Sequence, residues 1–247
     1  MGDEKRMLVF SRLRSTLNQK GFADFSQYFE YLTRDKTGEA AVVFINKLTT
    51  NHTFFMREPE HFEYLAKKAL PWVEEKFGGT KDLRLWCAAC SSGEEAYTLQ
   101  MVVQDYFANK FGWNLEILAT DISERVLQQA HHGIYSTESL KALPADWVKK
   151  YFKKYDEDNM VVSDDIKKLV TFRKFNLNEV NMPFKRQFHI IFCRNVMIYF
   201  DNTTREALVN RFYDRLEDDG YLFIGHSESL SNINTKFNYL IPAAYRK

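Results

Sequence analysis

Cysteine is scarce in this sequence, which has three in 247 residues, an odd number. A small secreted fold held together by disulfides is therefore excluded. Residues 1–20 are charged and contain no apolar signal-peptide core, so we expect an intracellular protein with reduced thiols. Cys87 and Cys90 have the C-x-x-C spacing of redox and zinc motifs. No second ligand pair follows at zinc-site spacing, so a thiol function is not favoured.

The sequence also has no extended apolar stretch and no surplus of basic or acidic residues. A membrane span needs ~18 uncharged apolar residues in succession, and none are found. The 34 lysines and arginines balance 33 acidic residues, giving a net charge of +1. A protein that acts on nucleic acid usually has a strong basic excess. The composition, 45% hydrophobic and 27% charged, excludes a disordered tail and a collagen. We expect a globular cytoplasmic protein with no membrane insertion, no nucleic-acid partner and nothing that demands more than a monomer.

Residues 1–48 have the periodicity of helices. Apolar residues recur at spacings of three and four in three successive sets, and each set lines one face of a helix. We therefore expect a small helical N-terminal domain over residues 1–48. Residues 1–20 contain five basic and two acidic residues. Such charge usually marks a solvated face, and the alternative is docking to an acidic partner.

Strands and helices alternate in residues 49–247. This alternation predicts an α/β fold with a doubly wound, mostly parallel sheet. Residues 133–172 interrupt the rhythm with a turn and a charged hairpin-like segment at 160–165, and we expect a small β subdomain inserted there. The expected strands are 83–87, 115–120, 188–193 and 221–225, and the expected helices are 94–107, one that begins at Ser123, and 201–216.

Small residues, from Ala88 to Gly93, form the turn after the first expected strand. Ligands of doubly wound folds bind at the carboxyl ends of strands, where small side chains let the backbone approach closely. The turn has one glycine and no P-loop lysine, so a phosphate cradle is not favoured. Glu94 and Glu95 open the next helix, and Asp121 ends the next strand, where it can accept hydrogen bonds from ribose hydroxyls. These carboxylates point to a cationic adenosine compound such as S-adenosylmethionine. The alternative is that the two glutamates only complement the helix dipole.

Three further segments sharpen this interpretation. They are residues 51–62 (NHTFFMREPEHF), the strand and turn at 86–97, and residues 192–200 (FCRNVMIYF), which are followed by GHSES at 225–229. In this order they resemble the CheR-type chemotaxis methyltransferases over nearly the whole chain. The resemblance implies a class I methyltransferase-like fold. It also implies an enzyme that transfers a methyl group from S-adenosylmethionine to glutamate side chains of chemoreceptors, with S-adenosylhomocysteine as product.

The resemblance implies roles for individual residues as well. Arg57 and Tyr199 fall where the family places side chains beside the transferred methyl group, and they are the candidate catalytic residues. Asn51, Thr53 and Arg57 belong to an N-x-T-x-x-x-R element that closes over the cofactor. The other candidate cofactor contacts are Glu95 and Asp121, Asn176 and Leu177 flanking the adenine, and Arg194 and Asn195 beneath the methionine part.

Three departures from the family pattern are visible. Ala96 stands where the family usually has proline after the paired glutamates, and the start of a helix tolerates either. The helical N-terminal region starts later than in the family, so we expect the family's first helix to be absent from this sequence. The insert segment 153–159 is short and has no glycine. In part of the family a glycine-bearing loop goes with gripping a tether at the receptor's C-terminus, so we expect a tether-independent enzyme.

Two other functions stay open. One is a related methyltransferase that acts on a small molecule or another protein. The other is a CheR-like module that senses S-adenosylmethionine and only recruits partners. Intact Arg57, Asn195 and Tyr199 favour catalysis over sensing. The six histidines do not form a metal set, so no resident metal is expected.

Overall fold

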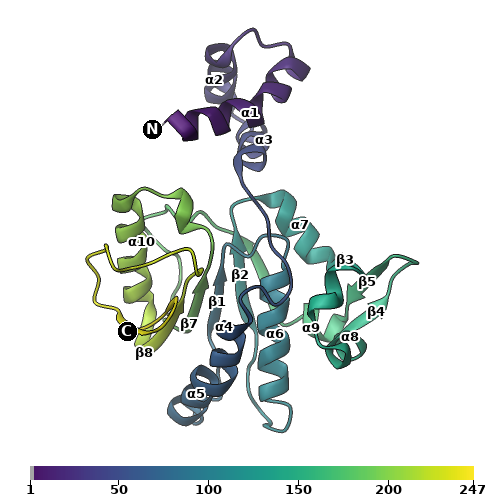
Figure 1. Cartoon of the computed structure of the whole chain (residues 1–247), viewed down its shortest axis with the longest axis vertical. Helices are drawn as coiled ribbons and strands as arrows, with labels where there is room; N and C mark the ends of the chain where they lie inside the picture. Colours follow the sequence, from purple (N-terminus) through teal and green to yellow (C-terminus); the bar gives the residue numbers. More distant parts are fainter. Residues whose placement is uncertain (1–2) are drawn as a thin grey trace. The chain divides into compact units, whose positions relative to one another are not determined.

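The computed structural model describes residues 3–247, which form two compact units (Figure 1). The first unit contains the residues up to His52 together with Ser123–Arg125, and the second contains Thr53–Ile122 and Val126–Lys247. Every helix within residues 3–247 is too short or too polar to cross a bilayer.

The first unit consists of three helices around its own core. Leu13, Leu17 and Tyr28 are buried at the centre of this core. Asp24 caps the second helix, because its carboxylate accepts the backbone N–H of Gln27 at 2.9 Å. The all-helical N-terminal region predicted from apolar spacing is confirmed. The helices are α1 (Asp3–Lys20), α2 (Phe25–Arg34) and α3 (Glu39–Leu48).

The second unit is built on a seven-stranded sheet with the order β6-β2-β1-β7-β8-β10-β9. The first five strands in this order run parallel, and β10 and β9 continue the sheet with antiparallel pairing. The mostly parallel α/β sheet predicted from the sequence is confirmed. Its strands are β1 (Leu85–Ala88), β2 (Ile117–Asp121), β6 (Val170–Lys174), β7 (Phe188–Cys193), β8 (Leu216–Phe223), β9 (Asn238–Ile241) and β10 (Ala244–Arg246).

Both faces of this sheet are covered, as buried parallel strands require. Side chains alternate along a strand, so Leu85 and Cys87 of β1 belong to one buried cluster and Trp86 and Ala88 to another. Helices α4, α5 and α6 pack in the first cluster and α10 packs in the second, so the sheet lies between two helical layers (Figure 1). The covering elements are α4 (Pro59–Tyr64), the π-helical turn η1 (Leu65–Ala69), α5 (Leu70–Phe77), α6 (Glu94–Tyr106) and α10 (Asn202–Arg215).

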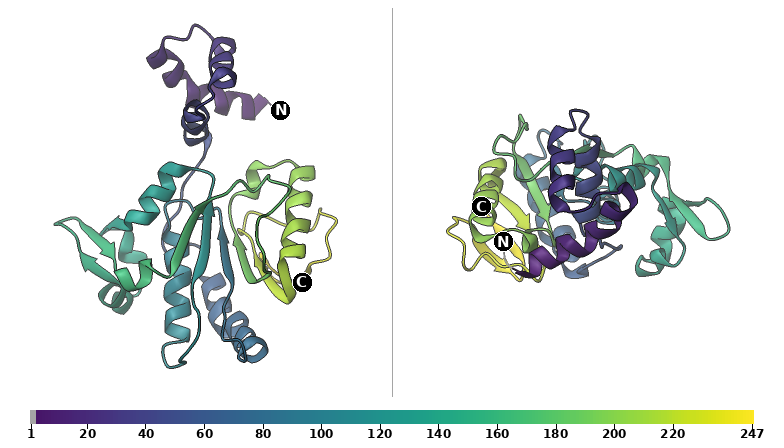
Figure 2. Two further views of the ribbon diagram at one scale, coloured as in Figure 1. Left: turned by 180° about the vertical axis from the view of Figure 1, so that it is seen from behind. Right: turned by 90° about the horizontal axis from the view of Figure 1, so that it is seen from above.

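A small antiparallel sheet with the order β3-β5-β4 is inserted between α7 and β6, and Figure 2 shows it to one side of the main sheet. Phe152 pairs with Val162 in this sheet, and both are buried. The hairpin joins β4 to β5, so it turns before residue 159. The segment predicted as a hairpin at 160–165 instead ends β5 and begins α9. The elements are α7 (Glu124–His132), β3 (Ile134–Ser136), η2 (Ser139–Ala142), α8 (Ala145–Tyr151), β4 (Phe152–Lys154), β5 (Asn159–Val162) and α9 (Asp164–Lys167).

Three strands of the main sheet were not predicted. Strand β6 pairs in parallel with β2, with Phe172 opposite Ala119. Strands β9 and β10 pair antiparallel after the last parallel strand. All three are short, and β6 and β9 expose about half of their residues. Apolar spacing is therefore a weak signal for these short strands, which lie towards the two edges of the sheet.

Candidate functional site

The turn after β1 has an unusual backbone. Ala89, Ser91 and Gly93 all have left-handed φ angles, of 66°, 50° and 98°. A side chain at Gly93 would also clash, because its Cβ would lie 2.8 Å from the Cβ of Ala130 and 2.9 Å from the hydroxyl of Tyr135. The glycine and the small residues around it therefore satisfy a requirement of the backbone itself.

Asp121 ties this turn to the end of β2. The backbone N–H of Ser91 donates to its carboxylate at 2.9 Å, and the N–H of Cys90 donates to the carbonyl of Thr120 at 2.8 Å. Asp121 is the last residue of β2 and is buried. The predicted ribose-binding carboxylate is thus positioned at the carboxyl end of a strand, beside the turn.

Arg194, which follows β7, is a buried guanidinium between two carboxylates. Its Nη2 lies 2.9 Å from Oε2 of Glu58, and its Nη1 lies 3.0 Å from Oε2 of Glu95. Nη2 also donates to the carbonyl of Arg57 at 2.5 Å, and the thiol of Cys87 donates to Oε1 of Glu95 at 3.3 Å. These contacts, which we call the Arg194 cluster, join three segments that are far apart in the sequence.

The two carboxyl groups of the Arg194 cluster titrate differently. Burial raises the pKa of Glu95, and the charge of Arg194 offsets this only in part. Burial acts in the same direction on Glu58, but the charge and hydrogen bond of Arg194 and the amide of Asn195 outweigh it, so the pKa of Glu58 lies below its ordinary value. The cluster has two carboxyl groups for one guanidinium, an acidic surplus that suits a cationic ligand.

Glu228 organises the loop that carries Asn195. Asn195 has a left-handed backbone, with φ of 57°, and its amide donates to Oε1 of Glu58 at 3.2 Å. The buried carboxylate of Glu228 accepts four backbone N–H groups, from Gly225 at 2.6 Å, Met197 at 2.7 Å, Asn195 at 3.0 Å and a fourth at 3.3 Å. Burial raises the pKa of Glu228 and these N–H groups act against that rise. Glu228 was not predicted as a site residue, although its place just beyond an apolar strand is a usable signal in the sequence.

The two candidate catalytic side chains differ in exposure, since Tyr199 is exposed whereas Arg57 is half-buried. Tyr199 lies in the 3-10 turn η3 (Met197–Tyr199) and is 42% exposed. The guanidinium of Arg57 lies 5.7 Å from the ring of Phe54, and Arg57 and Thr53 are both half-buried. An exposed side chain such as that of Tyr199 can reach a second molecule, as a transfer to a protein substrate requires.

Glu94 and Glu95 share the start of α6 but have different partners. Glu94 accepts a hydrogen bond from the hydroxyl of Ser92 at 2.7 Å, and burial raises its pKa. Glu95 turns instead to Arg194. A local role at the helix start therefore fits Glu94, and a role in the site fits Glu95.

The remaining predicted cofactor residues are Asn176, Leu177 and Asn51. Asn176 and Leu177 come directly after Phe175, whose backbone N–H donates to the carbonyl of Asp121 at 3.0 Å. Asn176 and Leu177 follow β6: the side chain of Asn176 accepts the N–H of Asn178 at 3.0 Å, and Leu177 is buried in the second core cluster. Asn51 belongs to the first unit, where its amide donates to the hydroxyl of Thr49 at 3.2 Å. Contact between these residues and a cofactor stays a prediction.

The residues present fit the cofactor that the sequence suggests. The turn after β1 is made of small residues, and carboxyl groups from β2, α6 and the loop before α4 lie at or near it. Such a set can accept hydrogen bonds from ribose hydroxyls and attract an ammonium or sulfonium group. A phosphate would meet repulsion from the same acids.

Known protein families match both units of the chain. Residues 51–244 match the CheR methyltransferase, SAM binding domain, and residues 1–49 match the CheR methyltransferase, all-alpha domain. A chemotaxis protein methyltransferase of Borreliella burgdorferi is 42% identical over 100% of this chain and 88% of its own length. The chemotaxis protein methyltransferases of Salmonella typhimurium and Escherichia coli are 38% and 37% identical, each over 96% of this chain and 81% of their own length.

Proposed function

The chain belongs to the CheR methyltransferase family, whose cofactor is S-adenosylmethionine, and from this premise we propose that it methylates glutamate side chains of chemoreceptors. The product is a glutamate methyl ester, formed during chemotaxis adaptation. The enzyme acts in the cytoplasm, as a monomer, on the cytoplasmic domain of the receptor. The observation that supports this proposal is the Arg194 cluster, which draws together the segments containing Arg57, Glu95 and Asn195.

The chemistry places few demands on the protein. A glutamate carboxylate is already ionised at neutral pH, because its ordinary pKa is about 4.3, so no general base is needed. When bound, the cofactor would supply an activated methyl group on a sulfonium centre: a bond from the acceptor oxygen to the methyl carbon would form as the carbon–sulfur bond breaks, and S-adenosylhomocysteine would leave as the neutral thioether. The protein has to align the acceptor and remove water from it, and alignment can contribute roughly 7–11 kcal/mol.

Arg57 and Tyr199 are the side chains that we assign to this alignment. Arg57 holds a carboxylate, either that of the cofactor or that of the substrate, and Tyr199 orients the acceptor oxygen or the methyl group. Tyr199 is exposed and can reach a bound receptor, and Arg57 is half-buried. Arg194 and Glu95 are charged groups that hold the cofactor side of the site in place.

The variants Arg57→Ala and Tyr199→Phe test this assignment. Each should lower the rate of methyl transfer by at least about a hundredfold, the scale of a lost alignment contact, and Tyr199→Phe should change S-adenosylhomocysteine affinity much less. A small change of that affinity in Arg57→Ala assigns Arg57 to the substrate's carboxylate, and a large loss assigns it to the cofactor's. Arg173→Ala on β6 and Tyr239→Phe on β9 are matched controls, because both residues are exposed and outside the Arg194 cluster. Full activity in Arg57→Ala and Tyr199→Phe would remove these two residues from the chemistry.

One labelling experiment separates the proposed function from its alternatives. The protein is incubated with methyl-labelled S-adenosylmethionine and receptor-bearing membranes. Alkali-labile label on the receptor is the expected result, because esters hydrolyse in base. Label on another molecule would indicate a different acceptor, and tight cofactor binding without transfer would indicate a sensing module.

Tether independence is a separate prediction about the insert. The turn between β4 and β5 spans residues 155–158 and has no glycine. Calorimetry with a peptide from the receptor's C-terminus should give millimolar or no binding. Micromolar binding of the peptide would overturn this prediction without affecting the proposed methylation.

A further inference from the structure

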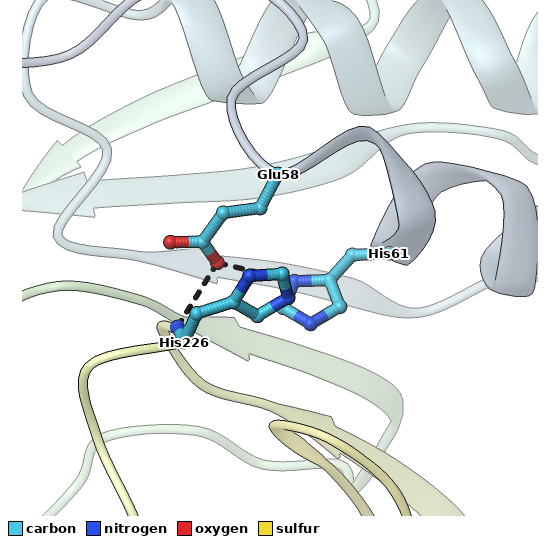
Figure 3. A group of neighbouring side chains, drawn as sticks. All are labelled: Glu58, His61 and His226. Carbon is cyan, nitrogen blue, oxygen red and sulfur yellow. Dashed lines mark hydrogen bonds and ion pairs between the residues drawn. The ribbon is translucent and has the colours of Figure 1, made fainter.

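Glu58, a member of the Arg194 cluster, converges with His61 and His226 (Figure 3). One ligand atom of each lies within 4.8 Å of the others. Glu58 and His61 stand at the start of α4, whereas His226 comes from the loop after β8. His61 is buried and His226 is exposed, so the group reaches from the interior to the surface.

The ring of His61 is placed between two groups that can only accept hydrogen bonds. Its Nε2 lies 3.4 Å from the carbonyl of Pro242, and its Nδ1 lies 3.5 Å from Oε2 of Glu58. A neutral imidazole has one N–H, so in either tautomer one nitrogen lone pair faces an oxygen. Nδ1, which is completely buried, has no hydrogen-bond partner.

A positive charge between Nδ1 and the carboxylate would remove this mismatch. A second proton is one way, but it would place a charge on a completely buried ring whose neighbour Glu58 is already paired with Arg194. A metal ion is the other way. Donation of the Nε2 proton to a backbone carbonyl is the usual support of a metal-binding histidine, and the Pro242 carbonyl lies on that side of the ring.

We propose that Glu58, His61 and His226 form a binding site for a divalent transition-metal ion, with Zn²⁺ as the preferred ion, and that its binding inhibits the enzyme. Two imidazoles and one carboxylate are a ligand set that holds Zn²⁺ and leaves a fourth position open. The exposed ring of His226 gives the ion a route from solvent. Histidine spacing in the sequence does not predict this set, because His61 and His226 come together only in the fold.

Inhibition follows from the partners of Glu58 and rests on the proposed function. Arg194 contacts Oε2 of Glu58 at 2.9 Å, and Asn195 donates to Oε1 at 3.2 Å. A metal ion on Oε2 competes with Arg194 for the same oxygen and repels its charge. The ion therefore loosens the cluster that holds two predicted cofactor residues, Arg194 and Asn195.

Co²⁺ added to the metal-free full-length protein tests binding without any assay of activity. Tetrahedral coordination should give saturable visible absorption bands, and Zn²⁺ should displace them. His226→Gln, which alters an exposed side chain, should weaken binding by at least about tenfold, whereas His132→Gln on the exposed end of α7 should match the wild type. Absence of a saturable signal, or equal affinity in His226→Gln and the wild type, would overturn the site.

The inhibitory effect is measured in two ways. Zn²⁺ should weaken S-adenosylhomocysteine binding by the wild type at least about tenfold more than binding by His226→Gln, and it should slow methyl transfer by the wild type selectively. If no receptor methylation is found but Co²⁺ binds as described, the proposed function fails and the metal site stands. If Zn²⁺ binds but affects cofactor affinity equally in the wild type and His226→Gln, inhibition through this site is refuted.

Discussion

His189 is a buried histidine at the start of β7, outside the candidate site. Its Nδ1 accepts the N–H of Arg84 at 3.1 Å, and its ring centre lies 3.9 Å from that of Phe77. Burial, followed by the charge of Arg84, lowers the pKa of His189 to about 3. The folded protein therefore holds this ring neutral, whereas the unfolded chain protonates it near pH 6.5.

Mild acid should destabilise the protein through His189. Because the folded pKa lies below the unfolded one, the stabilisation is complete above about pH 6.5 and is lost as the pH falls towards 3. From pH 7 to about pH 5, His189 should account for a loss of ~2 kcal/mol in the free energy of unfolding. Urea titrations at the two pH values measure this loss of unfolding free energy. The loss should be smaller by about this amount in His189→Gln than in the wild type, and it should be the same in His132→Gln as in the wild type. An equal pH dependence in His189→Gln and the wild type would contradict the lowered pKa of His189. If the variant does not fold, NMR of the wild type replaces this comparison. A His189 ring signal that titrates near pH 6 would then contradict the lowered pKa.

Two loops of the second unit meet at Gly225. This residue follows β8, and a Cβ there would lie 2.3 Å from Nδ2 of Asn195 and 2.9 Å from its backbone nitrogen. The loop after β7 is itself fixed by Glu228, which accepts its backbone N–H groups. The loops after β7 and β8 therefore have to be considered together, and glycine is what allows them to approach.

Gly225→Ala should displace Asn195. We expect a loss of ~1–3 kcal/mol in the free energy of unfolding, the scale of an overpacked site, and S-adenosylhomocysteine affinity reduced at least about tenfold. Urea unfolding and calorimetry measure the two effects. Gly79→Ala is the matched control, because nothing lies within 4 Å of a Cβ at Gly79. Unchanged cofactor affinity in Gly225→Ala would contradict the predicted contact between Asn195 and the cofactor.

The central elements could be predicted from the sequence because their patterns are strong. Strand β7 is buried at every position, and a continuous apolar run of that length has few other interpretations. Strand β9 is partly exposed throughout, so it has no such pattern. In the site, the family resemblance implied roles for Arg194 and Glu95 but could not reveal that Glu58 is the second carboxylate on the same guanidinium. This pairing depends on the fold, because it joins residues from separate segments of the sequence.

The two units of the chain have separate hydrophobic cores. Leu13, Leu17 and Tyr28 pack with other residues of the first unit, and the residues of the Arg194 cluster belong to the second. Helix α1 exposes Arg6 and Arg14, and receptor cytoplasmic domains that present glutamates are suitable partners for these charges. Changes on α1 should therefore alter substrate binding and leave cofactor binding intact.

The double variant Arg6→Ala/Arg14→Ala tests this division. The KM for the receptor should rise by about two- to fivefold, since exposed charge pairs contribute ~0.5–1 kcal/mol, and the difference should shrink in high salt. S-adenosylhomocysteine affinity should not change. Lys68→Ala, in an exposed position of η1, serves as the control. A KM equal to that of the wild type would show that these two charges do not guide the receptor.

The three cysteines are all free and lie in or next to the two central strands of the sheet. They are Cys87 on β1, Cys90 in the turn that follows β1, and Cys193 at the end of β7. Burial raises the pKa of each thiol well above its ordinary range, and only a thiolate reacts readily with an alkylating reagent. Alkylation in native buffer consequently samples the rare moments when the middle of the sheet opens. The rate of alkylation of these native cysteines therefore reports local opening at the strand ends, with no probe introduced.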